Sequence, residues 1–186
     1  MEKRKRYQKK VCSIRIQPYL AEYCQKKFDK NPHNGGIVIP SWSDLYFCVW
    51  NNMRKAPLDA PSTDDANLLI DLPTRRSGCD DYPSKDPSYY NHLSAHGVKR
   101  VEECIRMMFN FEFHAFMMDN ENHGRTVKHS EMVDRFIRQY CLKSISTDAL
   151  LKNFYRYRNL IHPRKKRKYT HKDSGKRFNN VKSSSG

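Results

Sequence analysis

The chain has 186 residues, a formal net charge of +15 and 38% hydrophobic residues. This length suffices for one compact domain without metal or disulfide staples. The hydrophobic share lies below the roughly 45–50% that is usual when glycine is counted, so we expect part of the chain to be disordered. The sequence has no apolar run near the roughly 20 residues of a membrane span, and no apolar segment follows its charged start. We therefore expect no membrane partner and an intracellular location, cytoplasmic or nucleoid, or nuclear in a eukaryotic host.

The positive charge is concentrated at the two ends of the chain. Residues 1–10 contain six Lys or Arg and one Glu, and residues 152–186 contain twelve Lys or Arg and one Asp. The 17 bases and 18 acids between them nearly cancel. Basic arms beside a neutral body are typical of proteins that bind a polyanion such as nucleic acid.

The first 72 residues predict a disordered basic arm over 1–10 and a small α/β part over 11–72. Alternation of apolar and polar residues or short apolar runs predict three strands, at residues 11–17, 37–39 and 68–72. Pro18 suits the first turn of a helix over 18–28. Ser41 or Ser43 is expected to cap a second helix that ends near Met53.

The rest of the chain is predicted to be helical, after a long loop over 73–88. A helical segment covers 89–128, with a helix from Tyr89 to about Met118 that Gly97 is able to bend. Two further helices form a hairpin over 129–162, the first capped by Ser130 and ending near Tyr140. The second is capped by Ser146 and ends near Ile161, before Pro163. The predicted fold class is thus α+β and helix-dominated, with a disordered basic and Ser-rich tail over 163–186.

The helix pair resembles a helix-turn-helix, the motif in which the second helix enters a DNA groove. We expect apolar side chains to pack the second helix onto the first, namely Leu150, Leu151, Phe154 and Ile161. The opposite face would carry the polar residues Lys152, Asn153, Arg156 and Asn159, with Tyr155 and Arg158 at its margins. Arg and Lys contact phosphates or guanine, and Asn pairs with adenine. An ordinary helical hairpin with a solvated basic face is the alternative interpretation.

Two basic segments are expected to add phosphate contacts. One lies in the first arm and consists of Lys3, Arg4, Lys5 and Arg6. The other follows Pro163 and consists of Arg164, Lys165, Lys166, Arg167 and Lys168. The second segment also resembles a nuclear localisation signal, although such runs are common nucleic-acid patches.

The six cysteines form no CxxC pair, which indicates a reduced compartment and core packing. Cys79, His92 and His96 have the spacing of half a zinc finger, but the partner cysteine is missing. We therefore expect no metal and no cofactor. Nucleotide-binding loops and hydrolase motifs are absent from the sequence, so we expect no enzyme. An alternative is a magnesium-dependent endonuclease that uses the acidic loop 80–86, with Asp80, Asp81 and Asp86.

The sequence thus predicts a non-enzymatic DNA-binding protein, either a transcriptional regulator or an accessory factor of a mobile element. An RNA-binding or ribonucleoprotein component is the alternative, since charge alone does not separate DNA from RNA. A homodimer formed through the N-terminal part would suit a palindromic site.

Overall fold

The computed structural model describes residues 11–57, 65–73 and 85–163. These residues form five helices and four short strands, so the expected helix-dominated α+β class is confirmed. The strands are β1 (Val11–Ile14), β2 (Met53–Arg54), β3 (Leu68–Asp71) and β4 (His92–Leu93). The helices are α1 (Pro18–Lys27), α2 (Asp44–Asn52), α3 (Ala95–Asn122), α4 (His129–Tyr140) and α5 (Thr147–Ile161). The expected arm 1–10, most of the loop 73–88 and the tail from 164 lie outside the described residues.

The first sheet pairs the two ends of the N-terminal part. β1 and β3 run antiparallel, with Val11 opposite Asp71 and Ile14 opposite Leu68. The expected third strand at 37–39 is reduced to isolated bridges. One of them joins Ile37 to β3 through two backbone hydrogen bonds, of 2.8 Å to Leu69 and 3.0 Å from Asp71. Pro40 has no N–H to donate, so this pairing ends after a few residues.

A second, unexpected sheet joins β2 to β4. Each strand has two residues, with Met53 opposite Leu93 and Arg54 opposite His92. Two residues are too few for a pattern of alternation to be recognised. The sequence prediction therefore placed Met53 of β2 at the end of the second helix and the whole of β4 inside a later helix.

α3 is the central element of the fold, with 28 residues. It buries one stripe along its whole length, formed by Val101, Ile105, Phe109, Phe113 and Met117. The helix begins six residues later than expected, because the Ser94 hydroxyl accepts the backbone N–H of Gly97 at 3.2 Å and caps it there. Gly97 consequently lies in the first turn, and the helix continues unbroken past it.

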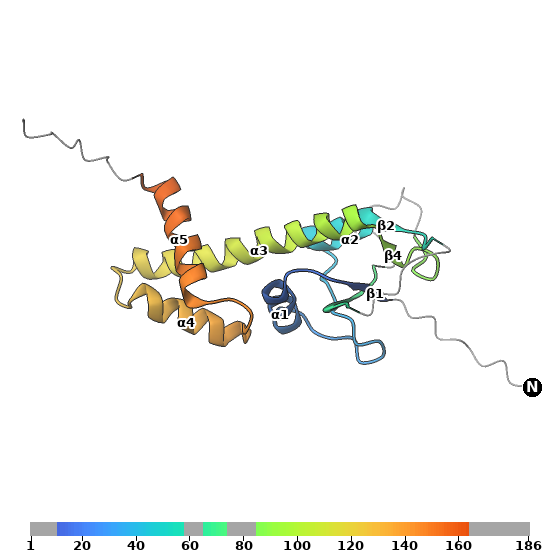
Figure 1. The fold of residues 1–186 in the computed structure, drawn as a ribbon, viewed down its shortest axis with the longest axis horizontal. Coiled ribbons are helices and arrows are strands. Elements are labelled where there is room, and N and C mark those ends of the chain that lie inside the picture. Colours follow the sequence, from blue (N-terminus) through green and yellow to red (C-terminus); the bar gives the residue numbers. More distant parts are fainter. Residues whose placement is uncertain (1–10, 58–64, 74–84, 164–186) are drawn as a thin grey trace, which may run out of the picture.

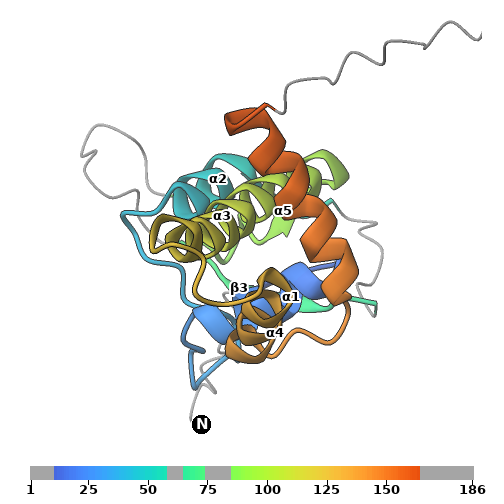
Figure 2. The same cartoon turned by 90° about the vertical axis from the view of Figure 1, so that its left-hand side faces the viewer.

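The other helices pack around α3 (Figures 1 and 2). α2 lies along its N-terminal half, while α4 and α5 lie along its C-terminal half, with α1 between them. Edge-to-face aromatic rings join three helices, with 5.2 Å between the centroids of Tyr23 and Phe109 and 5.7 Å between those of Phe109 and Phe136. Such pairs stabilise a core beyond the apolar area they bury.

A single carboxylate ties the same three helices together. Glu112 of α3 accepts hydrogen bonds from the hydroxyls of Tyr23 in α1 and Tyr140 in α4. It also accepts one from the ammonium of Lys27. Glu112 therefore provides the hydrogen-bond acceptor for the hydroxyls of two tyrosines whose rings are buried in the core.

Candidate nucleic-acid interface

α5 is the helix that the sequence predicts to enter a DNA groove. It begins after Ser146 and ends at Ile161, as the sequence predicts. The Ser146 hydroxyl accepts the N–H of Ala149 at 3.2 Å, as expected for an N-cap. Leu150 and Phe154 are buried against the rest of the fold. Ile161 was expected to pack in the same way, but it is 42% exposed. The reason is that α5 crosses α3 and α4 steeply and its last turn projects beyond them (Figures 1 and 2).

The connection between α4 and α5 differs from the compact helix-turn-helix. α4 begins at His129, with Lys128 rather than Ser130 at its N-cap position. It ends at Tyr140, and the C-cap Cys141 adopts φ 52° in the left-handed region where glycine is usual. Residues 141–146 then join the helices, which is longer than the three to four residues of the compact motif.

A carboxylate of α1 holds this connection in place. Glu22 accepts the backbone N–H of Lys143 at 2.7 Å and that of Ser144 at 3.2 Å. It also accepts the hydroxyl of Ser144. Although burial raises the pKa of Glu22, these hydrogen bonds outweigh it and leave the pKa lowered. The charged Glu22 thus fixes where α5 starts relative to the N-terminal part.

Three of the expected contact residues lie on the exposed surface of α5. Lys152, Arg156 and Asn159 are exposed and follow one another at intervals of four and three residues. This spacing places them on one face of the helix. They form what we call the outer face of α5, with the two cations one turn apart.

Asn153 does not belong to this outer face. Its amide nitrogen donates to Oδ1 of Asn110 at 3.2 Å, and its oxygen lies 2.6 Å from Nε2 of His114. Both partners belong to α3. The ring of Tyr157 stacks on His114, with 3.9 Å between centroids, and completes this contact. The structure therefore places Asn153 in the packing of α5 onto α3.

Tyr155 and Arg158 lie together on a neighbouring side of α5 and are both anchored. The Tyr155 hydroxyl lies 3.3 Å from Nδ1 of His129, and the Arg158 guanidinium is paired with Glu121 at 3.1 Å. The guanidinium carbon of Arg158 also lies 5.9 Å from the centroid of the Tyr155 ring. These two residues therefore have a fixed geometry at the surface.

His129 is the buried centre of that arrangement, with a side chain only 2% exposed. Its Nε2 lies 3.0 Å from Oε1 of Glu121. Burial, with Arg125 and Arg158 nearby, lowers the pKa of His129 against the opposing effect of Glu121. A neutral imidazole has one N–H donor and one acceptor nitrogen. Nδ1 is the ring nitrogen that lies against the Tyr155 hydroxyl, whereas Nε2, although 3.0 Å from Glu121, makes no hydrogen bond of good geometry among the described residues.

The turn between α3 and α4 supplies two cations that the sequence analysis missed. Arg125 is close enough to His129 to affect its pKa, and Lys128 is exposed at the N-terminus of α4. The sequence shows both as basic residues beside the predicted hairpin. Only the fold brings the turn next to Tyr155 and Arg158.

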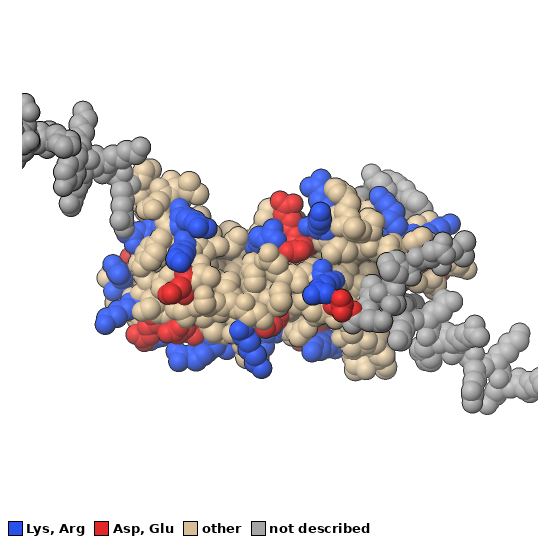
Figure 3. Space-filling view, viewed as in Figure 1, with Lys and Arg blue, Asp and Glu red and all other residues tan. Residues whose placement is uncertain are grey.

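The described surface at this end of the molecule carries both signs of charge. Figure 3 shows Lys and Arg along α5 and at the adjacent end, with Asp and Glu among them. The expected contact residues Lys3, Arg4, Lys5 and Arg6, and the run Arg164, Lys165, Lys166, Arg167 and Lys168, lie outside the described residues. The run begins directly after Pro163, two residues beyond the end of α5.

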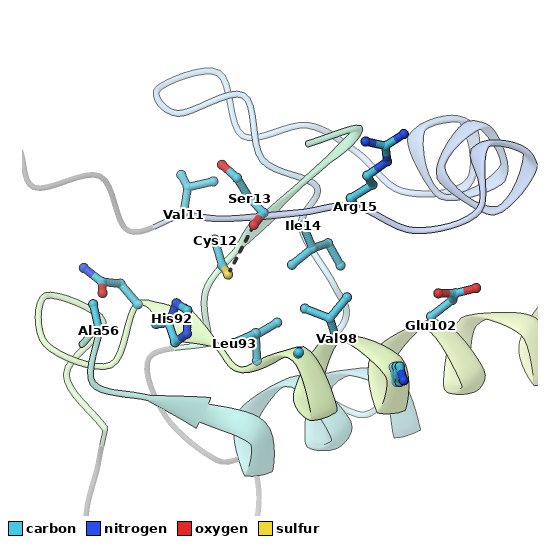
Figure 4. Close-up of a pocket in the computed structure, with 13 residues that line it drawn as sticks. Val11, Cys12, Ser13, Ile14, Arg15, Ala56, His92, Leu93, Val98 and Glu102 are labelled. Atoms are coloured by element: carbon cyan, nitrogen blue, oxygen red, sulfur yellow. Dashed lines mark hydrogen bonds between the residues drawn. The ribbon is translucent and has the colours of Figure 1, made fainter. Parts of the chain in front are cut away.

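A second candidate site is an open hollow of about 630 Å³ between β1, β4 and the start of α3 (Figure 4). Ile14, Leu93 and Val98 give it an apolar lining. His92 and Glu102 lie at opposite ends of it in Figure 4. Burial raises the pKa of the Cys12 thiol to about 11, so this sulfur is not a thiolate at neutral pH. The Cys12 thiol is therefore a poor nucleophile in this hollow.

The other features of the described residues do not offer a better candidate than α5. Within residues 11–57, 65–73 and 85–163, no three His, Cys, Asp or Glu side chains are grouped to hold a metal ion. None of the five described helices is both long and apolar enough to cross a bilayer. The acidic loop lies outside the described residues except for Asp86. In comparisons with known proteins, no family model, curated protein or solved structure matches this chain.

Proposed function

We propose that this protein is a non-enzymatic DNA-binding protein. It holds the phosphate backbone with the outer face of α5, with the turn between α3 and α4, and with its basic terminal segments. The observation that carries this proposal is the alignment of Lys152 and Arg156 on one exposed face of a helix. The chain then leads from that helix into five consecutive cations, residues 164–168.

The terminal segments and the outer face of α5 make different kinds of contact with DNA. The terminal cations contact phosphates, which gives affinity without sequence preference. Arg156 and Asn159 are the residues on the outer face that suit base edges, because Arg pairs with guanine and Asn with adenine. Regulation of transcription, or an accessory role on a mobile element, is the kind of process that such a protein serves.

The test is duplex binding as a function of salt, measured by fluorescence anisotropy. Replacing both Lys152 and Arg156 by Ala removes the phosphate contact of Lys152 and the base contact of Arg156, and the lost phosphate contact lowers the slope of log K against log salt by about 1. A chain that ends at Pro163 loses more of the slope and weakens all duplexes alike. Arg156→Ala alone relaxes the preference for a selected site.

The matched control is Lys99→Ala, an exposed cation in the first turns of the same long helix α3. It lies about 20 Å along α3 from His114, where α5 crosses. This variant is expected to bind duplex DNA as the unaltered protein does. Equal losses for Lys99→Ala and for the α5 double variant would refute the assignment of α5, and no duplex binding at low salt would refute the function.

A further inference from the structure

Tyr155 is an unusual surface residue because it is both exposed and held in place. The residue is 38% exposed. Its hydroxyl lies against buried His129, and the Arg158 guanidinium lies over its ring. A side chain that is already ordered loses less conformational freedom when a ligand binds.

The contacts around Tyr155 form a closed cycle of four side chains. Tyr155 meets His129, whose other ring nitrogen faces Glu121 at 3.0 Å. Glu121 pairs with Arg158 at 3.1 Å, and Arg158 returns to the Tyr155 ring. His129 is only 2% exposed, and its Nε2 lies close to Glu121 without a hydrogen bond of good geometry. This cycle of contacts gives the Tyr155 ring and the Arg158 guanidinium one fixed orientation at the surface.

Cations and one carboxylate lie around this ring, with Arg158 over it and Glu121 paired with Arg158. Arg156 is the next residue along the helix, and Arg125 and Lys128 come from the turn that leads into His129. Aromatic rings beside cations are the combination with which proteins bind single-stranded nucleic acids, because bases stack on the ring while the cations follow the phosphates.

We propose that Tyr155, together with Arg158, forms a stacking site for an unpaired nucleobase. This inference rests on the proposed function and makes it more specific. A ring stacks only on the face of a base, and in an intact duplex each face is covered by the neighbouring base pair. The ligand is therefore a base in a single strand, a bulge or an opened duplex, with its flanking phosphates on Arg125, Lys128 and Arg156. Every base has an aromatic face, so the site tolerates different sequences.

The experiment compares the full chain with Tyr155→Ala, Tyr155→Phe and the control Tyr89→Ala. Tyr89 is also an exposed tyrosine, but it lies before β4, at the far end of α3. The probes are a single DNA strand of about ten nucleotides, the same strand as RNA, the paired duplex, and that duplex with one bulged 2-aminopurine. Circular dichroism verifies that each variant is folded.

Tyr155→Ala is expected to weaken binding of the single strand and the bulged duplex by about tenfold or more, while the paired duplex changes by less than about twofold. Tyr155→Phe keeps the ring but loses the hydroxyl contact with His129, so its affinity for these probes should lie between those of the intact protein and Tyr155→Ala. The intact protein quenches the fluorescence of the bulged 2-aminopurine by stacking, and Tyr155→Ala does not. Comparison of the DNA and RNA strands distinguishes the source of the base, and a loss on either strand supports the site.

Three results would overturn the inference. The first is a Tyr155→Ala variant that binds every probe as the intact protein does. The second is an equal loss for Tyr155→Ala on paired and unpaired probes, and the third is an equal loss for Tyr89→Ala. In these cases DNA binding, and with it the proposed function, still stands. If no probe is bound even at low salt, both proposals fail together.

Discussion

Removal of the Glu112 side chain provides a sharp test of how the three central helices are held together. Glu112→Ala leaves the hydroxyls of Tyr23 and Tyr140 without their acceptor, and both tyrosines are buried. A buried polar group that loses its partner costs about 1–3 kcal/mol. The ion pair with Lys27 is partly exposed and adds about 0–1 kcal/mol.

The expected total for Glu112→Ala is about 3 kcal/mol of unfolding free energy, toward the lower end of the summed range because both hydrogen bonds are only partly buried. For a chain of this size, a loss of this kind lowers Tm by about 6–12 °C. Urea and thermal unfolding, followed by circular dichroism, measure both quantities. The control is Glu131→Ala, which breaks an exposed pair with Arg135 in α4 and is expected to cost less than about 0.5 kcal/mol.

The same variant has a defined dependence on pH. Burial alone raises the pKa of Glu112, but the hydrogen bonds from Lys27, Tyr140 and Tyr23 outweigh it, so the pKa is lowered in the folded protein. The stabilisation by a carboxylate of this kind is complete above its unfolded pKa and is lost as the pH falls through its folded pKa. The difference between the intact protein and Glu112→Ala should therefore shrink in acid. A difference below about 1 kcal/mol at neutral pH, or one that acid leaves unchanged, would refute the reasoning.

Three further predictions concern other parts of the fold. Ser146→Ala removes the cap of α5 and should cost about 1 kcal/mol in urea unfolding, whereas an unchanged stability would argue against the cap. Glu22→Gln removes the charge that holds the connection before α5, so hydrogen exchange at the Ser144 amide should accelerate at neutral pH. The difference from the intact protein should fade in acid, as Glu22 becomes protonated. Equal exchange rates at neutral pH would contradict this prediction. A hydrogen bond from the Cys104 thiol lowers the pKa of Cys48 to about 7. Iodoacetamide should therefore alkylate Cys48 first, and the alkylation rate should reach half its maximum near pH 7. A half-maximal rate at the ordinary thiol pKa would refute this prediction.

The elements with strong local signals could be predicted from the sequence. Pro18, Ser43 and Ser146 mark helix starts that the structure confirms, because a cap or a fixed φ acts within one turn. In α3, the buried residues Val101, Ile105, Phe109 and Phe113 recur at every fourth position, a helical period that is visible in the sequence. Signals of this kind require only neighbouring residues.

What the sequence did not reveal depends on contacts between distant residues. Lys128 rather than Ser130 precedes α4, and the two-residue strands β2 and β4 find each other only through the fold. Helical periodicity places Asn153 near the polar side of α5, yet α3 passes there and engages its amide. The grouping of Tyr155 with Glu121 depends on the steep crossing of α5 over α3, which no local pattern encodes.

The length of α3 determines how the molecule can be dissected. Its 28 residues extend for about 42 Å, and one continuous buried stripe faces β4 and α2 at one end and α4 and α5 at the other. A fragment that contains only one end of α3 would expose Phe109 or its neighbours to water, and exposed apolar surface of this kind promotes aggregation. Both ends should therefore melt in a single transition, and the roles of the two ends have to be separated by point substitutions in the intact chain.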